Sequence, residues 1–120
     1  MSAMNNNTKL VLAAAVLLAG CTINGDTRVE GWPKLKTVEH YVSTVAMFDQ
    51  CQKYAPWGSV VEACAEFDLT LGVCNIYYSK DFPPSQRVID HEREHCEGYD
   101  HIGGTELQML LNARNRELGR

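Results

Sequence analysis

The sequence predicts a single small α+β domain, in which a short antiparallel β-hairpin lies between helices and two disulfides stabilise the fold. The apolar residues follow helical spacing in the first part of the predicted domain, alternate in its middle, and return to helical spacing at the end. Four cysteines also lie beyond the predicted export leader and the cysteine that directly follows it. A domain of this size buries a modest core, and disulfides or a metal ion commonly supplement it.

Residues 1–20 are predicted to be a signal peptide. Lys9 supplies its positive charge, and the ten residues Leu10–Ala19 that follow are apolar. A bilayer-spanning helix needs about 20 apolar residues, so this segment is too short to be one. We therefore expect the chain to be exported without spanning the membrane.

The sequence LAGC at residues 18–21 resembles the lipobox of bacterial lipoproteins. The resemblance implies that Cys21 is lipidated and becomes the first mature residue, so that a lipid anchor holds the protein to a membrane. Residues 21–36 are then predicted to form the lipidated cysteine and a tether. Thr22 follows the cysteine in place of an aspartate, which predicts a location in the bacterial cell envelope, on the outer membrane facing the periplasm. The alternative is an ordinary signal peptide with a cysteine there by chance.

Residues 37–120 are predicted to form the domain itself, beginning with a helix. Thr37–Tyr54 has apolar residues at three- and four-residue intervals, which is the pattern of an amphipathic helix. Pro56 and Gly58 would end this helix.

A hairpin is predicted next, because β-branched and aromatic residues in short alternations replace the helical pattern. The two strands are expected at Val61–Phe67 and Gly72–Tyr78. Asp68–Thr70 would form the turn between them.

Two further helices are predicted after the hairpin. Ser85 follows two prolines and can cap the first of them, Gln86–Glu97. Gly98 is a natural C-terminal stop for that helix, because glycine adopts positive φ without strain. Thr105 is a plausible cap for the last helix, Glu106–Glu117.

The cysteines left after Cys21 form an even set, as a two-disulfide framework in an exported protein requires. Three pairings are possible. We favour Cys64 with Cys74 across the hairpin, and Cys51 with Cys96 between two helices. The alternative that Cys96 binds a metal is disfavoured, because it follows His95 directly and adjacent helical residues point about 100° apart.

The segment HEREHCEGYDH at residues 91–101 has the pattern of a metal site. His91 and His95 are four residues apart, so both imidazoles project from one helix face and can reach the same ion. Gly98 lets the chain turn sharply so that His101 can supply a third ligand. Glu92 lies beside that face and could act as a general base. Three protein ligands with a fourth position open are typical of catalytic zinc sites, and we expect one Zn²⁺ per chain.

These residues resemble the zincin metallopeptidases, and more closely the metzincins, whose motif is HExxHxxGxxH. The resemblance implies a zincin-like module that hydrolyses peptide or amide bonds with a zinc-bound water activated by Glu92. It also implies a peptide or protein substrate, such as a cell-wall peptide. The strand Gly72–Tyr78 resembles the edge strand along which zincins bind an extended substrate. Asp90 or Asp100 could orient a ligand imidazole.

The charge balance of the chain argues against nucleic acid as a partner. The protein has 11 lysines and arginines against 15 aspartates and glutamates, and loss of Lys9 with the leader leaves a net charge of about −5. Nucleic acid is therefore not an expected partner.

The alternatives to an envelope-anchored metallopeptidase are a metal-delivery protein and a non-catalytic lipoprotein. The latter would be stabilised by zinc and disulfides and would serve as a binding or structural component of the envelope or of a mobile-element machinery.

Overall fold

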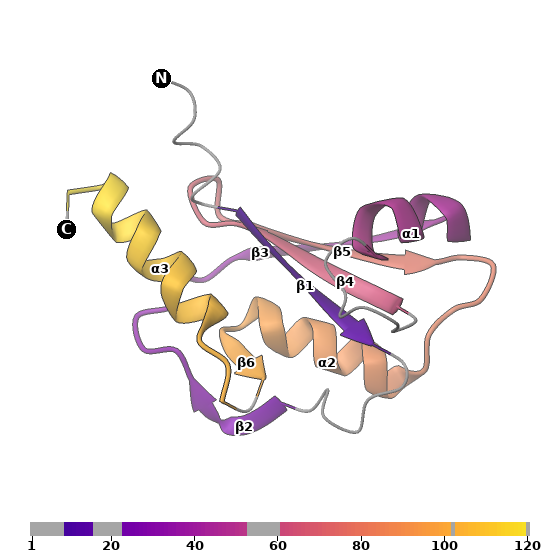
Figure 1. Cartoon of the computed structure of the whole chain (residues 1–120), viewed down its shortest axis with the longest axis horizontal. Helices are drawn as coiled ribbons and strands as arrows, with labels where there is room; N and C mark the ends of the chain where they lie inside the picture. Colours follow the sequence, from indigo (N-terminus) through magenta and orange to yellow (C-terminus); the bar gives the residue numbers. More distant parts are fainter. Residues whose placement is uncertain (1–8, 16–22, 53–60, 102, 120) are drawn as a thin grey trace.

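The computed structural model of the chain describes residues 9–15, 23–52, 61–101 and 103–119 (Figure 1). Within these residues three helices and six strands form an α+β fold with two disulfides, which confirms the predicted fold class. The elements in chain order are β1 (Lys9–Ala15), β2 (Ile23–Arg28), β3 (Lys36–Val42), α1 (Thr44–Cys51), β4 (Val61–Asp68), β5 (Val73–Ser79), α2 (Gln86–Cys96), β6 (Tyr99–His101) and α3 (Glu106–Glu117).

The larger sheet has the strand order β1-β4-β5-β3, and a second sheet pairs β2 with β6. β4 and β5 are antiparallel and form the predicted hairpin. The side chain of Asp68 accepts a hydrogen bond from the Leu71 N–H at 3.0 Å and its carbonyl accepts one from Gly72, which has a φ of +73°. β1 is antiparallel to β4, whereas β3 is parallel to β5.

The predicted helix Thr37–Tyr54 is wrong in its first part, which forms β3. Four of its seven residues are β-branched or aromatic, and pairing with β5 satisfies their backbone groups. Within the predicted helix, the residues that follow Ser43 are the ones that form a helix, α1. The Ser43 side chain accepts a hydrogen bond from the Ala46 N–H at 3.1 Å and so caps α1.

The predicted edge position of the strand Gly72–Tyr78 is also wrong. That segment is β5, which lies between β4 and β3 in the sheet. An additional strand from the N-terminal part of the chain and the unexpected strand β3 flank the hairpin, so β5 has no free edge. β4 is the strand that pairs with β1.

The two helices α1 and α2 cover opposite faces of this sheet (Figure 1). On one face Met47 and Cys51 of α1 pack against Cys64 of β4. On the other face the core is larger and combines α2, α3, β4, β5 and Trp32. Its buried members are Trp32, Ala63, Ala65, Phe67, Leu69, Cys74, Ile76, Tyr78, Cys96, Leu107, Leu110 and Leu111.

The favoured disulfide pairing is wrong, because the bonds join Cys51 to Cys64 and Cys74 to Cys96. Cys74 pairs in register with Phe67, and Phe67 is three residues from Cys64. Side chains three residues apart on a strand point to opposite faces, so Cys64 and Cys74 cannot meet. Each disulfide therefore ties one helix to the sheet face it covers, and Cys96 is not available as a metal ligand.

Part of the segment 21–36, predicted to be a tether, packs against the domain. β2 pairs with β6, and the side chain of Trp32 is only 5% exposed. Its ring meets that of Phe67 edge-on, with the centroids 5.7 Å apart. The indole Nε1 donates a hydrogen bond to the carbonyl of Cys96 at 2.9 Å.

Residues 9–15 fall inside the predicted signal peptide, and in the structure they form β1 along β4. Cleavage after Gly20 and lipidation of Cys21 stay predictions, since both residues lie outside the described part of the chain. Among the described residues, no helix is both long enough and apolar enough to cross a bilayer.

Replacing Cys74 and Cys96 together by alanine should lower the free energy of unfolding by about 2–4 kcal/mol, because the bond closes a loop between residues 22 positions apart. Urea unfolding of the oxidised protein measures this loss. Peptide mapping without reduction is the companion test of the pairing. A cross-linked peptide containing Cys64 and Cys74 would contradict the structure.

Candidate metal centre

α2 carries two of the three predicted metal-binding histidines and begins at the predicted cap. The Ser85 side chain accepts a hydrogen bond from the Val88 N–H at 3.4 Å, and the Ser85 carbonyl accepts one from Ile89 at 3.1 Å. His91 and His95 are four residues apart and therefore share a helix face. His95 is fully buried and His91 is half-buried.

The turn after α2 directs the third histidine back toward this face. Gly98 has a φ of +103°, as expected for the residue that ends the helix. Its N–H donates to the carbonyl of His95 at 3.0 Å, and its own carbonyl accepts from the Val29 N–H at 2.9 Å. A Cβ at Gly98 would lie 2.7 Å from Cγ of Trp32. Only glycine fits this turn, and β6 follows it with His101 at its end.

Asp100 fixes the backbone on both sides of the last histidine. Its Oδ1 accepts a hydrogen bond from the His101 N–H at 2.7 Å, and its Oδ2 accepts one from Leu107 at 2.9 Å. Asp100 therefore caps α3, whereas the predicted cap Thr105 makes no such side-chain hydrogen bond. Oδ1 of Asp100 also lies 3.9 Å from Nδ1 of His101, while Asp90 is exposed.

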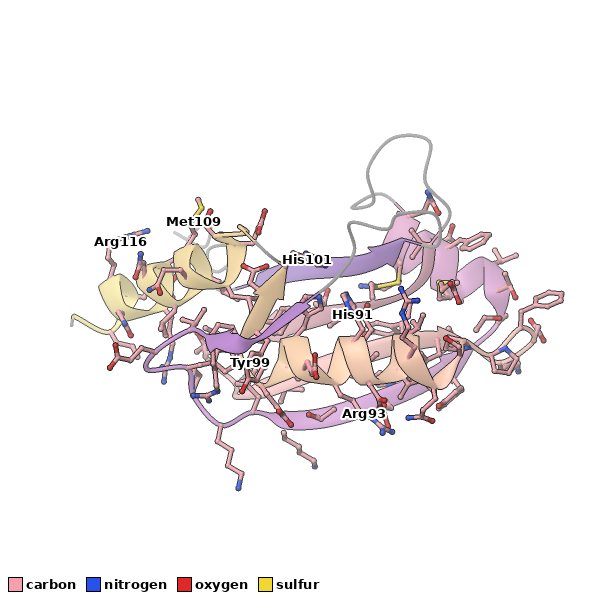
Figure 2. The ribbon with its side chains drawn as sticks, turned by 90° about the horizontal axis from the view of Figure 1, so that it is seen from below. His91, Arg93, Tyr99, His101, Met109 and Arg116 are labelled. Atoms are coloured by element: carbon pink, nitrogen blue, oxygen red, sulfur yellow. A yellow bond between two sulfur atoms is a disulfide. The ribbon has the colours of Figure 1, made fainter. Side chains whose placement is uncertain are left out.

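His91, His95 and His101 come together between α2 and β6, and Figure 2 shows where the first and last of them lie. Each offers one ring nitrogen, and the three nitrogens lie within 4.8 Å of one another. The Nε2 atoms of His91 and His95 are 3.2 Å apart. Two nitrogens that bind one tetrahedral ion at about 2.0–2.1 Å are separated by roughly 3.3 Å. The three histidines could therefore hold a metal ion.

A hydrogen bond sets the tautomer of His95. Its Nδ1 lies 2.7 Å from the carbonyl oxygen of Tyr99. Because a carbonyl can only accept, Nδ1 carries the proton, and Nε2 of the neutral ring keeps its lone pair for a metal ion. Metal-binding histidines are commonly oriented by such a partner on the second ring nitrogen.

Burial favours the neutral form of the His91 and His95 imidazoles by lowering the pKa of each. Burial, followed by the nearby His101 and Arg87, lowers the pKa of His91 to about 4. Burial also lowers the pKa of His95 well below its usual value, and His91 and His101 add to this effect. Metal ions compete with protons for imidazole nitrogens, so low pKa values leave the site ready to bind an ion at neutral pH.

Glu92 is a buried carboxyl without a partner. Its side chain has no exposed surface, and neither carboxyl oxygen makes a hydrogen bond within the described part of the chain. Burial raises its pKa well above the usual 4.5. Such a group costs folding free energy, and a perturbed carboxyl beside possible metal ligands is typical of a functional site. Because Glu92 and His95 are three residues apart on α2, they project from neighbouring positions on the helix surface.

An ion pair from β3 fixes the orientation of α2. Nη2 and Nε of Arg93 donate to Oε1 and Oε2 of Glu39 at 2.8 and 2.9 Å, and the Tyr78 hydroxyl donates to Oε2 at 2.7 Å. The Arg93 hydrogen bonds lower the pKa of Glu39, while burial and the bond to Glu39 raise the pKa of Tyr78. The sequence prediction missed this network because it placed Glu39 on a helix. The β-branched and aromatic side chains within residues 37–42 were the signal that could have placed it on a strand.

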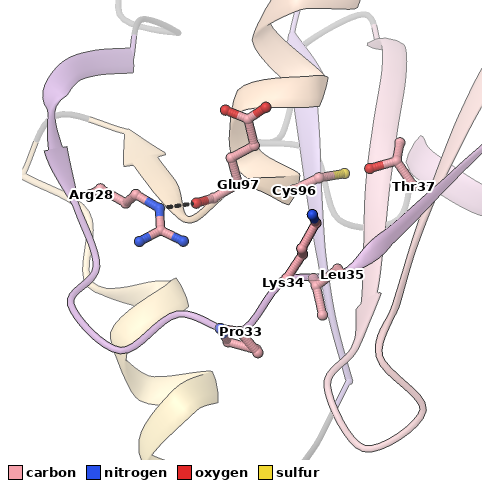
Figure 3. Close-up of a pocket in the computed structure, with 7 residues that line it drawn as sticks. All are labelled: Arg28, Pro33, Lys34, Leu35, Thr37, Cys96 and Glu97. Carbon is pink, nitrogen blue, oxygen red and sulfur yellow. Dashed lines mark hydrogen bonds between the residues drawn. The ribbon is translucent and has the colours of Figure 1, made fainter.

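A separate pocket of about 380 Å³ lies beside the C-terminal end of α2 (Figure 3). Arg28 is among the residues that line it and donates a hydrogen bond to the carbonyl of Glu97 at 2.6 Å. None of the three histidines lines this pocket. The lining residues are Arg28, Pro33, Lys34, Leu35, Thr37, Cys96 and Glu97.

Comparison with known proteins gives no match: no protein family, curated protein sequence or solved structure is similar to the chain. The likeness of residues 91–101 to the zincin motif remains a resemblance of sequence. Function is therefore argued from the geometry of the cluster itself.

Replacing Gly98 by alanine should lower the free energy of unfolding by about 2 kcal/mol or more and should also weaken metal binding, because the new Cβ meets Trp32. Gly72→Ala is the matched control. Gly72 also has a positive φ, but nothing lies within 4 Å of the point that a Cβ would occupy there, so a cost of only about 1 kcal/mol is expected. Urea unfolding and metal titration of both variants test this, and equal losses would contradict the role of the Trp32 contact.

In the metal-free protein, Glu92→Gln should be more stable than the wild type, by a margin that grows as the pH rises from about 4.5. The raised pKa means that folded Glu92 holds its proton more tightly than unfolded Glu92, so the wild type loses stability as that proton is lost.

His91→Gln should show the opposite dependence of stability on pH. Its advantage should grow as the pH falls from the usual 6.5 toward about 4, because the unfolded state then takes up the proton that the folded state excludes. Thermal unfolding with a chelator at several pH values measures both margins, and margins independent of pH would contradict these assignments.

Proposed function

We propose that the chain is an envelope-anchored zinc metallopeptidase, held to the membrane by a lipid on Cys21. The observation that carries the proposal is the cluster of three imidazoles together with a buried carboxyl, Glu92, on the helix that supplies two of them. The resemblance of residues 91–101 to the zincin motif supports it independently.

The ligand set suits a hydrolytic site. Three imidazoles favour zinc among the common divalent ions, and no fourth histidine, cysteine, aspartate or glutamate of the described residues joins the cluster. A zinc ion in such a site would polarise the scissile carbonyl and lower the pKa of a bound water. These two effects are the chemistry that the metal would supply. The Tyr99 carbonyl would orient the His95 imidazole, and Asp100 would fix the backbone of His101.

Glu92 would move the protons of the reaction. Its raised pKa brings proton transfer closer to neutral pH, which is where a general base and acid works best. The carboxylate would accept a proton from the attacking water and then deliver it to the nitrogen of the leaving amine. The same protein group would thus serve both steps.

A peptide substrate could bind as an additional strand along β4. In the structure the edge of β4 pairs with β1, which belongs to the predicted signal peptide. Cleavage after Gly20 would remove β1 and leave the backbone groups of β4 free to pair with another extended chain. α2 contacts both β4 and β1, so a strand in this position would lie beside the helix that carries the histidines.

One observation favours a second candidate, a non-catalytic lipoprotein stabilised by metal and disulfides. The side chain of Glu92 has no exposed surface, and a general base must reach the substrate. If Glu92 stays covered in the mature protein, the metal only holds α2 and β6 together.

The first experiment is to measure bound metal in the exported, oxidised full-length chain and in two histidine variants. About one zinc ion per wild-type chain is expected, with a large loss of affinity in His101→Ala because one of three ligands is removed. His40→Ala is the matched control and should bind as the wild type does, since His40 lies outside the cluster and bonds Asn75. Absence of metal from the folded wild type would contradict both candidate functions.

The second experiment separates catalysis from structure. Glu92→Gln should keep its zinc but lose at least about 100-fold in peptide hydrolysis, which is the usual contribution of general acid–base catalysis. Peptide mixtures incubated with each variant and analysed by mass spectrometry measure this. If the zinc-loaded wild type cleaves nothing that Glu92→Gln leaves intact, the metallopeptidase proposal is wrong and the structural role is favoured.

A further inference from the structure

The pairing of β2 with β6 places Ile23, two residues after the predicted lipidated cysteine, opposite a residue of the metal cluster. β2 lies beside β6 (Figure 1), with Ile23 as the register partner of His101 and Arg28 as the partner of Tyr99. His101 is itself one of the three clustered histidines. The strand that leads away from the predicted lipid anchor is therefore the strand that pairs with a metal ligand.

Covalent geometry limits how far the anchor can be from the cluster. Cys21 precedes Ile23 by two residues, so their Cα atoms are at most about 7 Å apart. Paired residues on neighbouring antiparallel strands have Cα atoms roughly 5 Å apart. Adding the length of a histidine side chain and a metal bond of about 2 Å, a metal ion in the cluster lies within about 20 Å of the Cys21 Cα.

Contacts after β2 keep this segment from acting as a flexible spacer. The Val29 N–H donates to the carbonyl of Gly98 at 2.9 Å, and Arg28 donates to the carbonyl of Glu97 at 2.6 Å. Trp32 is buried in the core and bonds the carbonyl of Cys96. These three contacts fasten the segment to the turn that positions His101.

We propose that the metal centre operates at the surface of the bilayer, and that its substrates are peptide segments attached to or emerging from that surface. This rests on the proposed function for the lipid on Cys21 and for the metal. A polar headgroup layer is only about 5–8 Å thick on each side of the hydrocarbon, so an anchor this short leaves the cluster close to the headgroups. Peptides held far from the membrane would not reach it.

The test measures the distance between the metal and the membrane without requiring turnover. The lipidated protein is inserted into vesicles of phosphatidylethanolamine and phosphatidylglycerol that carry a headgroup fluorophore, and Cu²⁺ is bound at the cluster as an energy acceptor. One variant has about 20 glycine and serine residues inserted between Thr22 and Ile23, which adds roughly 25 Å of root-mean-square length. The matched control carries the same linker at the C-terminus, and His101→Ala provides the background.

Wild type and control should quench the fluorophore equally, and the inserted linker should reduce quenching at least about fivefold, because energy transfer falls steeply over the added distance. Equal quenching by the insertion variant and wild type, or no quenching by wild type that holds one Cu²⁺ per chain, would overturn the proposal. Failure of wild type to bind the vesicles would overturn it as well, because the lipid anchor would then be wrong.

The proposed location of the metal at the bilayer surface can be tested separately from peptide hydrolysis. Glu92→Gln should quench as the wild type does, whether or not the wild type hydrolyses peptides.

If the protein is a peptidase, the wild type should cleave a peptide joined to a lipid headgroup several-fold faster than the same peptide free in solution. The insertion variant should lose that preference while cleaving the free peptide at the wild-type rate. A preference unchanged by the insertion would contradict the proposed substrate class.

Discussion

The contact between the Trp32 indole and the backbone at Gly98 is the constraint on which the candidate metal centre depends. The indole occupies the space that a side chain at residue 98 would need, and its nitrogen bonds the carbonyl of Cys96 at the end of α2. The chain can therefore leave the helix only along one path. That path leads into β6 and brings His101 back beside the two histidines of α2. A residue outside the motif thus decides whether the motif can assemble.

The cluster also places unfavourable groups in the interior, and the rest of the fold offsets their cost. Buried imidazoles and a carboxyl that has no hydrogen-bond partner among the described residues each oppose folding. α2 is held against this cost at two places. The disulfide from Cys96 fastens its C-terminal end to the core strand β5, and Arg93, also in its last turn, forms an ion pair with Glu39 on β3. A rigid helix keeps the ring nitrogens at their spacing before any metal arrives, which lowers the entropy lost on binding.

The sequence was a good guide where local rules decide the structure. Ser85, the four-residue spacing of His91 and His95, and the positive φ of Gly98 are set by helix geometry and were predicted. Long-range pairing could not be predicted. β3 forms because β5 offers it a partner, and the disulfides follow from which face of the sheet each cysteine occupies, a property of register that one sequence does not reveal. The role of Trp32 was missed for the same reason, since its hydrogen bond to Cys96 joins residues 64 positions apart.

The order of the disulfides along the chain has a consequence for biogenesis. Cys51 joins the next cysteine, Cys64, and Cys74 joins the next, Cys96, so the two covalent rings are consecutive and do not overlap. A chain threaded through a membrane pore from its N-terminus presents its cysteines to an oxidant in this same order. Oxidising each pair as it emerges then yields the native bonds directly, with no need for an isomerase to rearrange crossed ones. Vectorial export and correct oxidation would thus be one process for this protein.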